Sequence, residues 1–161
     1  RSSDLNAAGQ KVSNDDVVVE NPKITDLQVK LLNDNIISPD QDISFEISYD
    51  VNEDIETYIA FSLTDIDRGI WIYNDNSMDN KTSGSGRKTL TYKCSLAHLN
   101  NIKLKLQVSV RDKEDQMIAF ADSENSPVIL LNRTDIEDDD KSAKDSATGM
   151  VQRNGKWEIQ E

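Results

Sequence analysis

Two aromatic residues, Trp71 and Tyr73, have the type and spacing best suited to a binding site. They lie two positions apart in residues 69–73, where Ile70 and Ile72 alternate with them. Side chains alternate across a β-strand, so if the two isoleucines face a core, both aromatic rings lie outside. Exposed aromatic planes stack on the apolar C–H faces of sugar rings. The spacing predicts a sugar-binding platform; the alternative is a one-residue slip that puts Trp71 in the core.

Two neighbouring predicted strands, residues 58–64 and the segment from residue 104, supply polar side chains for the same outer face. Their outward positions carry hydroxyl, amide and cationic groups, which bind the hydroxyls of a sugar. The two cations among them, Lys105 and Arg111, suit an anionic sugar, because charge-assisted hydrogen bonds to a carboxylate or phosphate are strong. The predicted carbohydrate-binding residues are therefore Trp71, Tyr73, Tyr58, Ser62, Gln107, Ser109, Arg111 and Lys105.

Catalytic and metal-binding motifs are missing from the sequence. His98 is the only histidine, and no motif places a serine and an aspartate beside it, so we expect a surface residue. The segment GSGRKT at residues 84–89 resembles a phosphate-binding loop, but Arg87 interrupts the required Gly-Lys-Ser/Thr triplet, and a hairpin is the simpler interpretation. The lone Cys94 provides no zinc site, and the acidic run at 135–145 lacks the turn glycine and closing glutamate of a calcium loop. We predict no catalytic residue, no metal and no cofactor.

Length and charge exclude several classes of protein. The chain has 161 residues, 36% of them hydrophobic, which suffices for one domain with a core and hardly for two. With 18 basic and 30 acidic residues the net charge is −12, which argues against nucleic acid and anionic membranes as partners. No apolar run approaches the roughly 20 residues of a membrane-spanning helix. A single cysteine gives no indication of an oxidising compartment.

The dominant hydrophobic period is two, the period of half-buried strands. Turn residues separate the alternating runs, and no segment of helical length shows an apolar stripe. This pattern predicts an all-β fold, an immunoglobulin-like antiparallel β-sandwich of Greek-key or jelly-roll type. The predicted strands cover residues 24–32, 43–51, 58–64, 69–73, 90–96, 104–110, 117–122 and 128–131.

Segments rich in charge and poor in large apolar residues flank the predicted sandwich at residues 23–132. Residues 1–22 have a net charge of −2, and six acids against two lysines give −4 in residues 135–145. Such compositions favour linkers, so we interpret 1–22 as a linker and 133–148 as an acidic tether. Residues 149–161 predict a further strand, with a turn at Asn154-Gly155 before Trp157. A tether of this length reaches roughly 50 Å, enough for the last strand to be exchanged in a dimer.

Four segments together resemble the C-terminal domains of the Wzt family, the ATPase subunits of ABC transporters that export O-antigen polysaccharide. They are ITDLQV at 24–29, DQDISFEISY at 40–49, DRGIWIYN at 67–74, and GMV at 149–151 with Trp157. The resemblance extends from about residue 24 to residue 159. One departure is the loop NNIK at 100–103, where the family often carries a glycine followed by an aromatic residue.

The resemblance implies a carbohydrate-binding module that recognises the modified non-reducing end of the finished lipopolysaccharide O-antigen. It implies a homodimer with an exchanged C-terminal strand, acting with transporter ATPase and membrane subunits at the cytoplasmic face of the bacterial inner membrane. The ATPase domain would precede residue 1, and the fragment itself would not be an enzyme.

Two other classes of function stay open from the sequence. A structural or adhesive immunoglobulin-like module would use its strands for protein contacts, and the sequons NKT at 80–82 and NRT at 132–134 are compatible with glycosylation of a secreted form. An accessory domain of a polysaccharide-processing enzyme would bind sugar while another domain performs catalysis.

Overall fold

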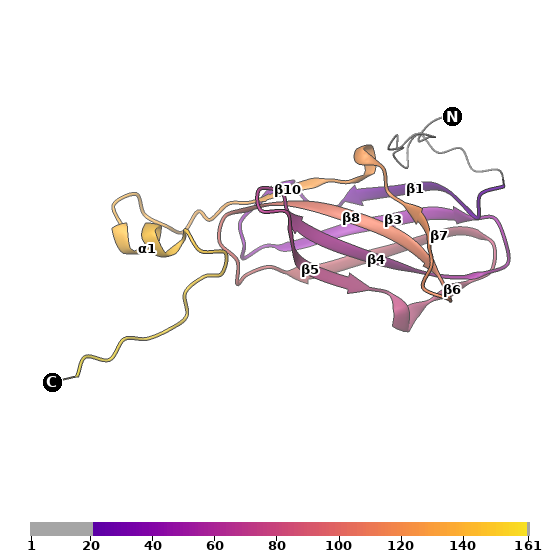
Figure 1. Cartoon of the computed structure of the whole chain (residues 1–161). Helices are drawn as coiled ribbons and strands as arrows, with labels where there is room; N and C mark the ends of the chain where they lie inside the picture. Colours follow the sequence, from indigo (N-terminus) through magenta and orange to yellow (C-terminus); the bar gives the residue numbers. More distant parts are fainter. Residues whose placement is uncertain (1–20, 161) are drawn as a thin grey trace, which may run out of the picture.

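The protein forms two β-sheets packed face to face, as the computed structural model of residues 21–160 shows (Figure 1). The smaller sheet, sheet A, has three antiparallel strands in the order β1-β3-β7. Its strands are β1 (Ile24–Leu31), β3 (Asp42–Val51) and β7 (Gly86–Ser95).

The larger sheet, sheet B, follows the path β2-β10-β8-β4-β5, with β6 added to β4 and β9 to β8. All of its pairs are antiparallel except the short parallel pair of β2 with β10. The strands are β2 (Ile36–Ile37), β4 (Glu56–Asp65), β5 (Ile70–Asn76), β6 (Thr82–Ser83), β8 (Ile102–Asp112), β9 (Met117–Phe120) and β10 (Val128–Leu131). Two 3-10 turns, η2 (Met78–Asn80) and η3 (Ser123–Asn125), connect strands.

These sheets confirm the predicted β-sandwich and its eight predicted strands, which correspond to β1, β3, β4, β5, β7, β8, β9 and β10. The two-residue strands β2 and β6 are too short to show any alternation. The core lies between the sheets and is built from the inward positions of the alternating runs. Phe45 of β3 and Phe61 of β4 meet edge to face across it, with 5.1 Å between ring centroids.

The glycine-rich segment at residues 84–89 is a crossover between the sheets, so the hairpin interpretation is wrong. Strand β6 pairs with β4 in sheet B, whereas β7 pairs with β3 in sheet A. Gly84 and Gly86 have φ angles of 83° and 117°, a backbone region that favours glycine, and they let the chain change sheets within a few residues. His98 is exposed, as predicted.

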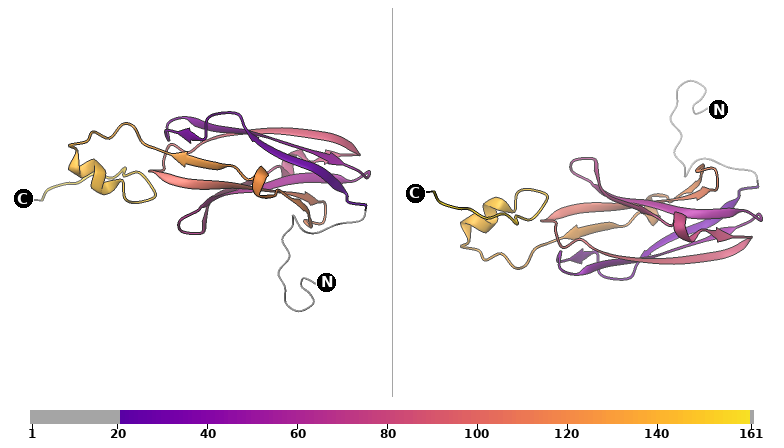
Figure 2. Two further views of the ribbon diagram at one scale, coloured as in Figure 1. Left: turned by 90° about the horizontal axis from the view of Figure 1, so that it is seen from above. Right: turned by 90° about the horizontal axis from the view of Figure 1, so that it is seen from below.

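The acidic segment at 133–148 contains one short helix, α1 (Lys141–Ser146), which buries none of its residues. The Asp140 carboxylate begins it by accepting a hydrogen bond from the backbone N–H of Ala143 at 3.0 Å. Helix α1 lies beyond the end of the sandwich opposite to the start of β1 (Figures 1 and 2). Composition alone gave no sign of the helix, because six residues carry no apolar stripe.

A buried amide holds both ends of the acidic segment at one place. The Asn100 side chain, 0% exposed, accepts a hydrogen bond from Arg133 Nη1 at 2.8 Å and donates one to the Gly149 carbonyl at 2.7 Å. Residues 149–152 therefore lie against the loop at 98–100 of their own chain. Val151 forms a single β-bridge with Leu99 there.

Beyond this bridge no strand is assigned in residues 152–160, so the predicted C-terminal strand and its exchange are not seen in the single chain. Trp157 is 98% and Ile159 is 89% exposed. Of the predicted linker at 1–22, residues 1–20 lie outside the described part of the chain. No helix in residues 21–160 is long and apolar enough to cross a membrane.

Candidate binding site

A cleft with a volume of about 410 Å³ lies on the outer face of sheet B, over β5, β4, β8 and β9. The core side of β4 and β8 is occupied by their apolar residues, so the alternate residues between them face this cleft. Six of the eight predicted binding residues line it: Tyr58, Ser62, Trp71, Gln107, Ser109 and Arg111.

The pairing register explains why residues distant in sequence share the cleft. Between β4 and β8, Tyr58 is opposite Arg111 and Ser62 is opposite Gln107. On the other side of β8, Arg111 is opposite Met117 of β9. Cross-strand neighbours point to the same face of a sheet, so one register brings hydroxyl, amide and guanidinium groups together.

Trp71 and Tyr73 lie on opposite faces of β5, which corrects the prediction that both rings face outward. Tyr73 is opposite the core residue Leu63, whereas Trp71 is opposite Thr64, and the register shifts between the two pairs. Ile72 is the extra residue of this β-bulge, and an extra residue reverses the alternation on one side of it. Trp71 is therefore outside and 73% exposed.

Tyr73 packs inward, where its ring stacks on Phe61 with 6.1 Å between centroids. Its hydroxyl is 2.5 Å from that of Tyr92 on β7, and Tyr92 in turn donates to the Asp75 carboxylate. Burial, and after it the bond to Asp75, raises the pKa of Tyr92, so the phenol stays a donor. This chain of hydrogen bonds joins the edge strand β5, which carries Trp71, to sheet A.

Tyr58 forms part of the cleft floor and is no stacking platform, because the residue is only 1% exposed. Its hydroxyl donates to Asp115 Oδ1 at 2.9 Å. Burial raises the pKa of Tyr58, and the hydrogen bond to the Asp115 carboxylate adds to the rise. The Tyr58 hydroxyl is therefore already used by the protein, and the centroid of its ring lies 5.9 Å from Lys81 Nζ.

The cleft keeps several polar groups free for a ligand. Within residues 21–160 no carboxylate lies within ion-pair distance of Arg111. Its guanidinium makes a long hydrogen bond, 3.5 Å from Nε to Ser109 Oγ, and its interaction with the Tyr58 hydroxyl partly offsets the rise in the pKa of Tyr58. Gln107 Oε1 accepts from Thr64 at 3.1 Å, which leaves its amide N–H groups unused. Lys105 lies on the same face, opposite Thr64, but outside the lining of the cleft.

Eight further residues line the cleft and are not among the predicted binding residues. Strand β5 continues to Asn76, past the predicted end at Tyr73. The prediction ended early because the last residues of the strand are polar and show no hydrophobic alternation. The sequence predicted the strand that became β9, but nothing local in it tells which strand it pairs with. These eight residues are Ala60, Phe61, Asn74, Asp75, Asn76, Met78, Met117 and Phe120.

Fold and cleft together define an all-β sandwich module with an open, mixed aromatic and polar site on one sheet face. Within residues 21–160 no cluster of three or more histidine, cysteine, aspartate or glutamate side chains is arranged to hold a metal ion. No family model matches the sequence, and no curated protein matches it either.

Among solved structures the chain is similar to the C-terminal domain of Wzt, with a TM-score of 0.54 and 9% identity over 87% of this chain and 86% of that one. At that identity the likeness establishes the fold alone. Two further solved structures are less similar. One is the CARDB domain of a Pyrococcus furiosus protein in complex with di-metal ions (TM-score 0.40, 12% identity over 71% of this chain and 97% of that one). The other is the Pseudomonas fluorescens alkylpurine DNA glycosylase AlkC bound to DNA with an abasic site analogue (TM-score 0.43, 9% identity over 68% of this chain and 30% of that one).

Proposed function

We propose that this domain binds carbohydrate in the cleft on sheet B and performs no catalysis. The observation that carries the proposal is the exposed indole of Trp71 beside free amide and guanidinium groups in one cleft. An indole offers a broad apolar plane for the C–H face of a sugar ring. Amides and guanidinium groups present planar sets of donors and acceptors for its hydroxyls.

The proposed ligand is the modified non-reducing end of a bacterial O-antigen polysaccharide. A chain end suits a cleft of about 410 Å³, which has room for a small ligand and is open on one side. An anionic end group would pair with Arg111, which has no partner carboxylate in residues 21–160. A small exposed glycan end buries little area, so the affinity should be modest.

The structural likeness to the Wzt C-terminal domain supports this proposal at the level of the fold. In the proposal the chain is the C-terminal part of an ATPase subunit at the cytoplasmic face of the inner membrane. It selects terminated polysaccharide for export, and ATP hydrolysis belongs to a domain outside residues 1–161.

Removal of the Trp71 ring tests the site. Titration of the source organism's terminated polysaccharide into Trp71→Ala should show at least a tenfold loss of affinity, the effect of losing a stacking partner worth about 1.5 kcal/mol. Leu32→Ala is the control, because this large apolar side chain is 48% exposed and lines no part of the cleft. Equal affinities for wild type and both variants would refute the site.

We further propose that two copies associate through the C-terminal segment. Its support is the exposure of Trp157 and Ile159, two large apolar side chains two positions apart that would be buried if the segment packed on a second copy. Residues 149–152 already contact their own chain, so the exchanged part is residues 153–160. Sedimentation of a chain ending at Gln152 should give a monomer and the full chain a dimer; identical masses would contradict the exchange.

A further inference from the structure

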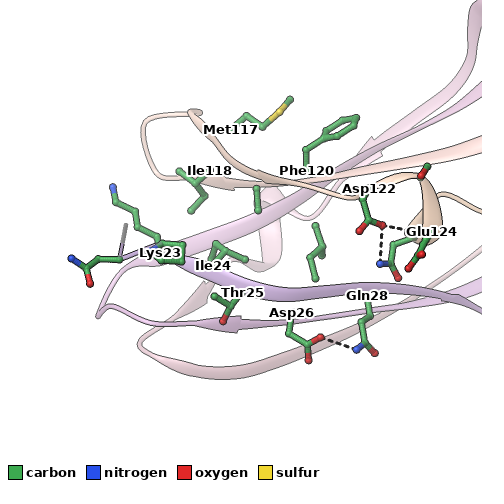
Figure 3. Close-up of a pocket in the computed structure, with 16 residues that line it drawn as sticks. Lys23, Ile24, Thr25, Asp26, Gln28, Met117, Ile118, Phe120, Asp122 and Glu124 are labelled. Carbon is green, nitrogen blue, oxygen red and sulfur yellow. Dashed lines mark hydrogen bonds between the residues drawn. The ribbon is translucent and has the colours of Figure 1, made fainter. Parts of the chain in front are cut away.

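A second, larger hollow lies beside the cleft, between the edge strands β1 and β9 (Figure 3). Its volume is about 1220 Å³. Each of these strands pairs on one side only, β1 with β3 and β9 with β8, so the hollow runs between the two sheets at an open side of the sandwich. We name it the β1–β9 groove.

The cleft and the β1–β9 groove adjoin at β9, where they share two lining residues. Met117 and Phe120 of β9 line both of them. In the register of sheet B, Phe120 is opposite Ser109 and Met117 is opposite Arg111, two residues of the cleft. A ligand that leaves the cleft across β9 therefore enters the groove directly.

Polar side chains dominate the walls of the groove. The Gln28 and Asp26 side chains, joined by a hydrogen bond of 2.8 Å, lie on the other side of β1, on the outer face of sheet A (Figure 3). Lys23, Ser123 and Glu124 are exposed, and their side chains make no hydrogen bond or ion pair within residues 21–160. Donors and acceptors of this kind suit a hydroxyl-rich chain.

The groove is poorly built for an added β-strand. The edge of β1 is interrupted by a bulge between Thr25 and Gln28, where Asp26 has a φ angle of 53°. Further along, the Val29 N–H, which points away from β3, already donates to Asn125 Oδ1 at 3.3 Å. Strand addition needs a regular row of free backbone groups, and β1 lacks one.

We propose that the β1–β9 groove is a second carbohydrate subsite, which takes the sugar units that follow the terminal one held in the cleft. The inference rests on the proposed function of the cleft and extends it: the ligand is a chain several units long, bent over β9, with Met117 and Phe120 beneath the bend. Binding then depends on the length of the glycan as well as on its end.

Titration with glycans of two lengths tests the subsite. The probes are short and long terminated fragments of the source organism's surface polysaccharide, and the proteins are the full chain and its variants. Lys23→Ala removes a polar partner, and Ser123→Trp fills the groove; each should lower the affinity for the long fragments by about tenfold, as one or two lost hydrogen bonds do. Neither should change the affinity for the short fragments. Thr89→Trp, on the outer face of sheet A, is the control and should change neither.

The outcomes separate the two proposals. Unchanged affinity of both groove variants for long fragments, with weaker binding by Trp71→Ala, overturns the subsite and keeps the cleft. Unchanged binding by Trp71→Ala overturns the cleft and the subsite with it. Self-association of the wild type that Ser123→Trp abolishes identifies the groove as a contact between two copies and overturns the inference. Thermal melting accompanies each variant, and if Ser123→Trp is destabilised, Lys23→Ala decides.

Discussion

The outer faces of the two sheets differ in how their polar groups are satisfied. On sheet A, Arg87 donates to Asp26 at 2.9 Å and to Ser48 at 2.8 Å, and it lies 3.4 Å from Asp50. On sheet B, Arg111 has no carboxylate within ion-pair distance in residues 21–160, and Trp71 beside the same cleft is 73% exposed. Both faces carry an arginine, but only the face of sheet A supplies its partners.

This difference suggests that the outer face of sheet A is an ordinary solvated surface, whereas polar groups on the outer face of sheet B are available to bind a ligand. Exposed ion pairs such as those of Arg87 keep a surface polar and add little stability. A large exposed aromatic beside a cation without a carboxylate partner suits a ligand that stacks on the ring and carries negative charge. The contrast favours the face of sheet B for the proposed ligand, without reference to any relative.

The largest effect is expected when the arginine is removed from each sheet face in turn. Arg111→Ala should lower the affinity for an anionic glycan by about ten- to a hundredfold, because a charge-assisted hydrogen bond contributes about 1.5–3 kcal/mol. Arg87→Ala should leave that affinity unchanged and lower the free energy of unfolding by about 0.5 kcal/mol, since its partners are exposed. Calorimetric titration and urea denaturation measure the two effects.

The reverse result would contradict the assignment of the faces. If Arg87→Ala weakened glycan binding and Arg111→Ala did not, the ligand would lie on sheet A. An intermediate Arg111→Lys variant keeps the charge and removes the planar fork of donors. Partial recovery of affinity in that variant would show that geometry contributes beyond charge.

The sandwich follows from the sequence because alternation is a local property. In β3, Ile43, Phe45 and Ile47 are buried at every second position, and this pattern needs no knowledge of neighbouring strands. The pairing of β9 with β8, and the change of sheet between β6 and β7, depend on contacts between distant residues. No local pattern encodes them.

The site follows from the sequence only where strands are regular. Ser62, Gln107 and Arg111 lie in uninterrupted stretches of β4 and β8, and alternation placed them on the correct face. Tyr73 was misplaced because a single extra residue, Ile72, shifts the register of β5. Neither hydrophobicity nor turn chemistry marks this bulge, since Ile72 suits a regular strand as well as an irregular one.

A smaller effect, on stability alone, is expected from two aspartates, Asp65 at the end of β4 in sheet B and Asp50 in sheet A. Asp65 ends β4 with 0% exposure and accepts hydrogen bonds from Arg68 Nη1 at 2.7 Å and from the backbone N–H of Asp67 at 2.9 Å. Burial alone would raise the pKa of Asp65, but Arg68 and the backbone donors outweigh it and hold the pKa below its usual value. Asp50, beside Arg87 on sheet A, is only partly buried.

A carboxyl group with a lowered pKa in the folded state stabilises the protein above its unfolded pKa of about 3.9 and loses that contribution as the pH falls through the folded value. Asp65→Asn should therefore lower the melting temperature at neutral pH, and the gap from wild type should narrow below about pH 4. Asp50→Asn should stay within about 0.5 kcal/mol of wild type throughout, as surface substitutions do. If the difference in melting temperature between wild type and Asp65→Asn instead widened in acid, Asp65 would be protonated in the folded protein. The β4–β5 turn beside Trp71 would then be stabilised by a neutral hydrogen bond and not by the ion pair with Arg68.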